Sequence, residues 1–120
     1  MTTVNKTRNT IGMVISGIVV LAMLASTGNK LIGGEGVTAF LTERGLGGKV
    51  LIIGIIELLC VIAFVIPKTN NIGFFLLTSY LGGAIVTELS AGEMPVPGVA
   101  LNTLLWVGTY LRKPEIFGLD

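Results

Sequence analysis

Histidine is absent from this 120-residue sequence, and Cys60 is its single cysteine. With one thiol and no imidazole, the chain forms no internal disulfide and offers no Cys- or His-based site for a metal, haem or iron–sulfur cluster. Charge is also scarce: Asp, Glu, Lys and Arg make up 12% of the residues, against about 25% in soluble domains. A net charge of +1 gives no electrostatic footprint for nucleic acid. We therefore expect an integral membrane protein without an intrinsic metal or cofactor.

Apolar residues make up 52% of the sequence and gather in four runs. The first lies between Arg8 and Lys30, and the second, which begins after Lys49, contains one charge, Glu57. Each run approaches the ~20 residues that an α-helix needs to cross ~30 Å of hydrocarbon. The sequence predicts one domain over residues 1–120, an all-α bundle of four transmembrane helices. The predicted spans are 10–28, 49–66, 72–89 and 97–111.

The connections between the predicted spans differ in kind. The longest, residues 31–48, is rich in glycine at both ends and carries Val37, Phe40 and Leu41 at helical spacing. It is either a short helix lying in the membrane interface or an ordinary glycine-rich loop. The connection at Lys68–Asn71 is short, so the second and third spans should be antiparallel neighbours.

The distribution of Lys and Arg predicts the orientation in the membrane. With the N-terminus in the cytoplasm, that side holds five cations: Lys6, Arg8, Lys68, Arg112 and Lys113. The opposite side holds three: Lys30, Arg44 and Lys49. We therefore expect both termini to be cytoplasmic. The first span also has the basic start of a signal peptide, but its apolar stretch is longer than such a signal requires.

Glu57 is the one charged residue inside a predicted span. It lies eight residues after Lys49, or ~12 Å along a helix, and a carboxylate at that depth costs about 2.5–3.5 kcal/mol. A cation, protonation or a water-filled cavity would each relieve this cost. Lys30, at the end of the first span, is the nearest candidate cation. Glu57 is thus either half of a structural ion pair, part of a ligand site, a catalytic acid/base, or a protonated packing residue.

Small and polar residues mark one face of each predicted span, which indicates either a cavity or close helix packing. The candidate ligand-binding residues are Lys30, Glu57, Tyr80, Thr87, Asn102 and Trp106. Glu57 is also the candidate catalytic residue. Glu88 and Glu93, which bound the third span, are expected to be solvated.

A succession of short motifs resembles the DoxX-like membrane proteins, which are small bacterial four-helix proteins. The motifs are Asn29-Lys30-Leu31, Phe40, Gly45-Leu46, Gly54-x-x-Glu57-Leu58, Ile66-Pro67 and Gly82-Gly83-Ala84-Ile85. The resemblance implies a bacterial cytoplasmic membrane location and makes Lys30, Glu57 and Pro67 family positions. Many relatives carry a histidine after the Gly-Ala pair, where this chain has Thr87 and Glu88.

The family's presumed link to quinol oxidase or thiosulfate–quinone oxidoreductase complexes implies an accessory membrane subunit. Beyond carboxylates, one thiol and methionines, this chain has no ligands for iron or copper, so a redox role would require a bound quinone or a partner protein. Three functions are therefore possible. The first is a protein that binds a quinone, isoprenoid or other lipid, or that serves as an accessory subunit. The second is a membrane isomerase or cyclase that uses Glu57 as general acid/base, and the third is a purely structural or assembly subunit. The expected partners are membrane lipids, a second copy of the chain, or a membrane oxidoreductase.

Overall fold

The computed structural model describes residues 5–118, and all regular structure within that range is helical. It contains five α-helices: α1 (Lys6–Ile32), α2 (Glu35–Glu43), α3 (Val50–Val65), α4 (Asn70–Ser90) and α5 (Val96–Arg112). Three short 3-10 turns accompany them: η1 (Gly47–Lys49), η2 (Pro67–Thr69) and η3 (Pro114–Phe117). The predicted all-α class is confirmed.

Three of the helical stretches are long and apolar enough to cross a membrane: Lys6–Ile32, Gly47–Val65 and Pro67–Ser90. Each overlaps a predicted span. The stretch Lys6–Ile32 exceeds its prediction at both ends because local caps extend it: the Asn5 side chain accepts a hydrogen bond from the Arg8 backbone N–H at 2.7 Å, and Gly33 ends α1 with φ 67°. At 17 residues, α5 is shorter than these three stretches, which have 27, 19 and 24 residues.

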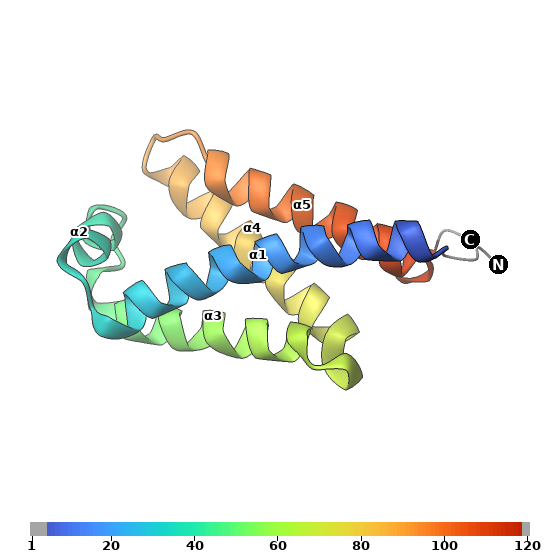
Figure 1. Cartoon of the computed structure of the whole chain (residues 1–120). Helices are drawn as coiled ribbons and strands as arrows, with labels where there is room; N and C mark the ends of the chain where they lie inside the picture. Colours follow the sequence, from blue (N-terminus) through green and yellow to red (C-terminus); the bar gives the residue numbers. More distant parts are fainter. Residues whose placement is uncertain (1–4, 119–120) are drawn as a thin grey trace.

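The connection between the first two predicted spans contains a helix, α2, so this part of it is helical rather than an irregular loop. Figure 1 shows α2 standing apart at one end of the molecule, beyond the junction of α1 and α3. The turn η2 follows α3 directly, and α4 then runs back across the molecule and packs against α3. The predicted neighbours are therefore neighbours in the structure.

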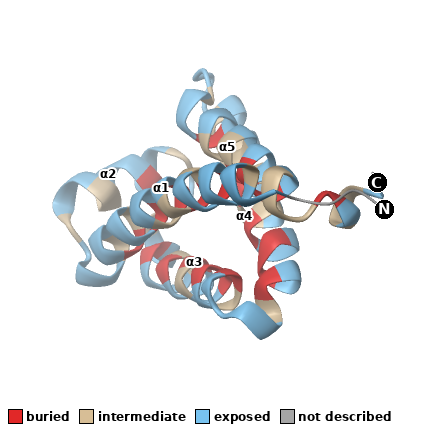
Figure 2. Cartoon of the chain, turned by 45° about the vertical axis from the view of Figure 1, so that its right-hand side comes forward, coloured by how far each residue is buried: buried red, intermediate tan, exposed pale blue. Residues whose placement is uncertain are grey.

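Helix α1 packs against α3 and α5, while α4 also packs against both of these helices. In Figure 2 the buried residues line the sides of the helices that face one another, and exposed residues cover the outside. The buried core consists of Val19, Met23, Cys60, Val61, Phe64, Phe74, Leu77, Leu81 and Leu105.

The outward faces are also apolar, unlike those of a water-soluble helical protein. Leu21 is 69% exposed, Leu59 60% and Val86 64%. Such side chains on three different helices would be unfavourable in water and favourable in lipid. The structure therefore agrees with a membrane protein whose helices carry apolar side chains on their outward faces.

Glycines allow the closest helix contacts. A Cβ at Gly73 of α4 would collide with the backbone of Phe64 of α3. At the contact between α1 and α5, a Cβ at Gly108 would lie 2.7 Å from the Ser16 Oγ and 3.1 Å from the Gly12 carbonyl oxygen. At these contacts the small-residue faces serve close packing, as in other membrane helices.

The turn η3 brings Phe117 back onto the helices. Its ring centroid lies 5.1 Å from that of Trp106, 5.4 Å from that of Phe74 and 5.9 Å from that of Tyr110. These are the separations of favourable aromatic pairs. The four rings form an aromatic cluster that closes one end of the core, which sequence reasoning did not anticipate.

Candidate functional site

Glu57 forms a buried ion pair with Lys30. The Lys30 Nζ lies 3.1 Å from the Glu57 Oε1, and the two side chains are 11% and 2% exposed. Ser26 joins them: its hydroxyl accepts a hydrogen bond from the Lys30 Nζ at 2.6 Å and donates one to the Glu57 Oε1 at 3.3 Å. We call Ser26, Lys30 and Glu57 the charged cluster; it connects the C-terminal half of α1 to the middle of α3.

The local sequence explains why these side chains meet. Ser26 and Lys30 are four residues apart on α1, so they lie on the same helix face. Gly54 stands almost one turn before Glu57 on α3, and a Cβ there would lie 3.0 Å from the Lys30 Cβ and 3.3 Å from the Leu31 Cδ2. The missing side chain at Gly54 lets the end of α1 approach α3 closely enough for Lys30 to reach the carboxylate.

The charged cluster is electrostatically self-contained. A buried ion pair offsets the desolvation of its two charges only with good geometry and further hydrogen bonds, and Ser26 supplies them here. Both hydrogen bonds to Glu57 end on Oε1. The Lys30 Nζ also lies 6.0 Å from the centroid of the Tyr80 ring, at the limit of a cation–π contact. The structure thus brings Lys30, Glu57 and Tyr80 together.

The other three candidate residues have different surroundings. The Thr87 hydroxyl donates to the Gly83 carbonyl oxygen of its own helix at 2.8 Å. The Trp106 Nε1 donates to the Thr78 hydroxyl at 3.1 Å, and its ring belongs to the aromatic cluster. The Asn102 Oδ1 is buried without a hydrogen-bond donor among residues 5–118. None of the three forms a hydrogen bond with the charged cluster within that range.

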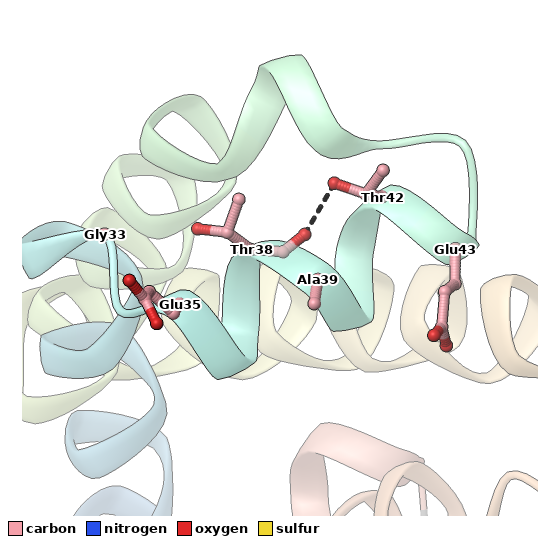
Figure 3. A pocket seen from close by; sticks show the side chains of 6 residues that line it. All are labelled: Gly33, Glu35, Thr38, Ala39, Thr42 and Glu43. Carbon is pink, nitrogen blue, oxygen red and sulfur yellow. Dashed lines mark hydrogen bonds between the residues drawn. The ribbon is translucent and has the colours of Figure 1, made fainter.

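Two cavities lie away from the charged cluster. One, of about 510 Å³, is lined by Gly33 and by the α2 residues Glu35, Thr38, Ala39, Thr42 and Glu43. Figure 3 shows these side chains along α2, with the Thr42 hydroxyl bonded to the Thr38 carbonyl oxygen at 2.7 Å. The other, of about 290 Å³, lies among the ends of α1, α3 and α5 near η2. Neither is lined by Lys30 or Glu57. Residues 5–118 hold no group of three acidic, His or Cys side chains that would suit a metal ion.

Arg44, just after α2, forms a second ionic cluster that sequence reasoning missed. Its Nε and Nη2 donate to the two carboxylate oxygens of Glu88 at 2.6 and 3.2 Å, and Nη2 donates to the Glu93 Oε2 at 2.5 Å. Its Cζ lies 3.5 Å from the centroid of the Phe40 ring. The hydrogen bond to Glu88 is the largest of the effects that raise the pKa of Arg44.

The expectation that Glu88 is solvated is therefore wrong. Its side chain is 15% exposed, because the bidentate contact with Arg44 covers it, whereas that of Glu93 is 52% exposed. The sequence gives no signal for this pairing, since Arg44 and Glu88 are 44 residues apart and several other charges lie nearer along the chain.

Comparison with known proteins assigns the family. The sequence model of the DoxX-like family matches residues 14–110, a stretch that runs from α1 to α5 and includes Lys30, Glu57 and Pro67. Neither the comparison with curated proteins nor that with solved structures gives a significant match. The resemblance suggested by the sequence motifs is confirmed, and the chain, with its apolar helices, belongs to the DoxX-like family of membrane proteins.

Proposed function

We propose that the protein crosses the membrane four times, with α5 as the fourth span. Its 17 residues extend ~25 Å at ~1.5 Å per residue, at the short end of the range for transmembrane helices. Arg112 and Lys113 mark its C-terminal end with charge. Helix α2 lies in the interface on the opposite side, and the four spans form one bundle around the charged cluster.

Both termini are cytoplasmic in this arrangement, and the membrane is a bacterial cytoplasmic membrane. The Arg8 Nε and Nη2 donate to the carbonyl oxygens of Leu111 and Tyr110 at 3.1 and 3.3 Å, so the start of α1 and the end of α5 lie on the same side. Lys113 joins that side to α4 through the Asn71 Oδ1 at 2.9 Å. The cation-rich side of the bundle faces the cytoplasm, as the positive-inside rule requires.

Within the membrane the protein serves as an accessory or assembly subunit of an oxidoreductase complex. The closed charged cluster supports a structural rather than a ligand-binding role: the carboxylate of Glu57 is engaged by Lys30 and Ser26, and the core beside it contains Cys60, Val61 and other apolar side chains. The oxidoreductase partner is what the family resemblance implies. The cluster fixes how α1 sits on α3. The exposed apolar faces of the helices then contact lipid or the helices of a larger partner.

A ligand site at Glu57 is the second candidate, favoured by one observation. Both hydrogen bonds to the carboxylate end on Oε1, so Oε2 is the oxygen that would bind the polar end of a quinone, isoprenoid or lipid, or act as general acid/base of an isomerase or cyclase. Tyr80, beside Lys30, would orient such a molecule. This function requires an opening beside Glu57, which neither described cavity provides.

The double variant Lys30→Met/Glu57→Met separates the two candidates, because it removes both charges while keeping similar side-chain volumes. Wild type, the double variant and a Cys60→Ala control are extracted from host membranes. Native electrophoresis measures the size of their assemblies, and mass spectrometry identifies the lipophilic molecules that copurify.

An accessory subunit predicts that all three chains migrate in the same large complex with an oxidoreductase and carry the same lipophilic molecules. A quinone or isoprenoid retained by wild type and Cys60→Ala but absent from the folded double variant would replace the accessory role with ligand binding. Migration of wild type only as a monomer or homodimer would also contradict it.

A further inference from the structure

The cavity of about 290 Å³ has two kinds of lining. Apolar side chains of α1 and α3, among them Met13, Val20 and Phe64, form one part of its wall. Polar side chains form the other: Ser16 of α1, Asn70 at the start of α4 and Arg112 at the end of α5. We call it the basic cavity. It lies at the end of the helices where α1 begins and α5 ends.

Three polar side chains in the wall of the basic cavity have atoms without a hydrogen-bond partner among residues 5–118; the Asn70 Nδ2 itself donates to the Phe64 carbonyl oxygen at 2.6 Å. Ser16 and Asn70 are each only 6% exposed, yet the Ser16 hydroxyl and the Asn70 Oδ1 have no hydrogen-bond partner among residues 5–118. The Arg112 Nε and Nη2 are also buried and have no acceptor in the same range. Buried polar groups in native proteins almost always have partners, and leaving N–H groups of a charged side chain buried without acceptors costs more than leaving neutral ones.

Arg44 and Arg8, unlike Arg112, have hydrogen-bond acceptors for their guanidinium groups. Arg44 is engaged by two carboxylates and a carbonyl oxygen, and Arg8 donates to two carbonyl oxygens. The Arg112 side chain packs against α1 at Gly12 and places its Cζ 5.7 Å from the centroid of the Phe64 ring, but its Nε and Nη2 find no acceptor among residues 5–118. A cation–π contact at that distance replaces little of what a carboxylate or phosphate provides.

Lys113 adds a second cation to the cavity wall. Burial and the adjacent Arg112 charge lower the pKa of Lys113, and the opposing effect of the Glu115 carboxylate is the smallest of the three. No carboxylate within residues 5–118 forms a salt bridge with either Arg112 or Lys113. The positive charge at this cavity is therefore not neutralised by the described part of the chain.

We propose that the basic cavity binds the headgroup of an anionic phospholipid that carries hydroxyls, of the phosphatidylglycerol type. The phosphate accepts hydrogen bonds from Arg112, Lys113 and Ser16. A headgroup hydroxyl donates to the Asn70 Oδ1, which a choline headgroup has no N–H or O–H to satisfy. The first carbons of an acyl chain lie along the apolar wall of α1. A volume of about 290 Å³ suits a headgroup, with the rest of the lipid in the bilayer.

The first test compares lipids on the purified full-length protein by native mass spectrometry in mild detergent. The probes are phosphatidylglycerol, phosphatidylcholine with the same acyl chains, and inorganic phosphate. We expect wild type to prefer phosphatidylglycerol. The variant Arg112→Gln should lower its affinity at least ~tenfold, the effect of losing charge-assisted hydrogen bonds. The control Lys68→Gln, which removes an exposed cation outside the cavity wall, should change it less than twofold.

A second pair of variants keeps both cations and does not depend on how well Arg112→Gln folds. Gly17 lines the cavity, and a Cβ there meets no atom within 4 Å. Gly28 on the same helix has the same open space but lies outside both described cavities. Leucine stabilises a helix relative to glycine, so both variants should fold. Gly17→Leu should weaken phosphatidylglycerol binding severalfold by occupying the apolar wall, and Gly28→Leu should not.

Three results would overturn the proposal. If Arg112→Gln and Lys68→Gln lost the same amount of phosphatidylglycerol affinity, binding would depend on overall surface charge and not on the basic cavity. Equal binding of phosphatidylglycerol and phosphatidylcholine would remove the role of the headgroup. Displacement of the lipid by inorganic phosphate at equal concentration, with Gly17→Leu unaffected, would make the cavity a site for a free anion.

Discussion

At the scale of single residues, the scarcity of charge allows the ion-pair partner of Glu57 to be predicted from the sequence. Because Lys30 lies just after the first predicted span and few other cations are available to a carboxylate on the second span, the sequence points to Lys30 as the nearest candidate. The structure pairs the two at 3.1 Å. The partners of Arg44 could not be predicted in this way, because several carboxylates were equally available and only the tertiary fold selects Glu88.

Ser26 offers a direct test of the hydrogen bonds inside the charged cluster. Ser26→Ala should lower the free energy of unfolding by about 1 kcal/mol, because the hydroxyl bonds to both members of the ion pair. The control Ser79→Ala removes an exposed hydroxyl bonded only to the Phe75 carbonyl oxygen of its own helix, and should leave stability nearly unchanged. Unfolding followed by circular dichroism in detergent gives both values, and equal effects would speak against the cluster.

At the scale of elements, the apolar runs predict where the long helices lie but not their exact ends. The cap at Asn5 and the left-handed Gly33 extend α1, and neither changes the hydropathy pattern strongly. Periodicity in residues 31–48 fitted both a helix and a glycine-rich loop, and the local pattern could not decide between them; in the structure α2 forms there and buries Leu41. The return of Phe117 onto Trp106 is a long-range contact that no local pattern encodes.

Gly73 tests the close approach of α3 and α4. Gly73→Ala should destabilise the protein by about 3 kcal/mol, the upper part of the range for overpacking, because the added methyl collides with backbone of Phe64 that cannot move independently of its helix. Gly82→Ala on the same helix meets no atom within 4 Å and should stabilise it by about 0.5–1 kcal/mol through helix propensity. Chemical unfolding of both variants measures the difference, and a harmless Gly73→Ala would refute the contact.

Arg44 tests how α2 is held in place. Arg44→Gln should increase amide hydrogen exchange in Glu35–Glu43 severalfold while leaving α3 protected. The reason is that Arg44 forms the ion pairs that connect this segment to Glu88 at the end of α4 and to Glu93 in the loop after it. Lys49→Gln, a change at an exposed cation in the next turn, is the matched control. Exchange in α2 that is the same in both variants would assign the position of α2 to packing alone.

At the scale of the whole molecule, the two ends differ in how their cations are used. Lys30 and Arg44, on the side of α2, are engaged in ion pairs, whereas the side where α1 begins holds more cations and the basic cavity. The sequence count of Lys and Arg predicted this asymmetry. It could not show which of the cations are neutralised, because that depends on side-chain contacts between helices.

Cysteine labelling tests the proposed orientation. In a Cys60→Ala background, Ala91→Cys in the exposed loop after α4 and Lys68→Cys in η2 place one thiol at each end of the helices, and the proposed orientation puts these ends on opposite sides of the membrane. A membrane-impermeant maleimide should label Ala91→Cys in intact cells and Lys68→Cys only after the cells are permeabilised. The reverse pattern would invert the topology, and labelling of both positions from outside would contradict the four-span arrangement.

A double-mutant cycle at Lys30 and Glu57 is the most direct measurement of whether the charged cluster is a structural pair. Lys30→Met and Glu57→Met alone should each lower the free energy of unfolding by about 3–5 kcal/mol, because each leaves a buried charge unpaired. The double variant should return to within about 1 kcal/mol of wild type or exceed it. A double variant that loses the sum of the two single effects would contradict the pairing and give Glu57 a role that Lys30 does not share.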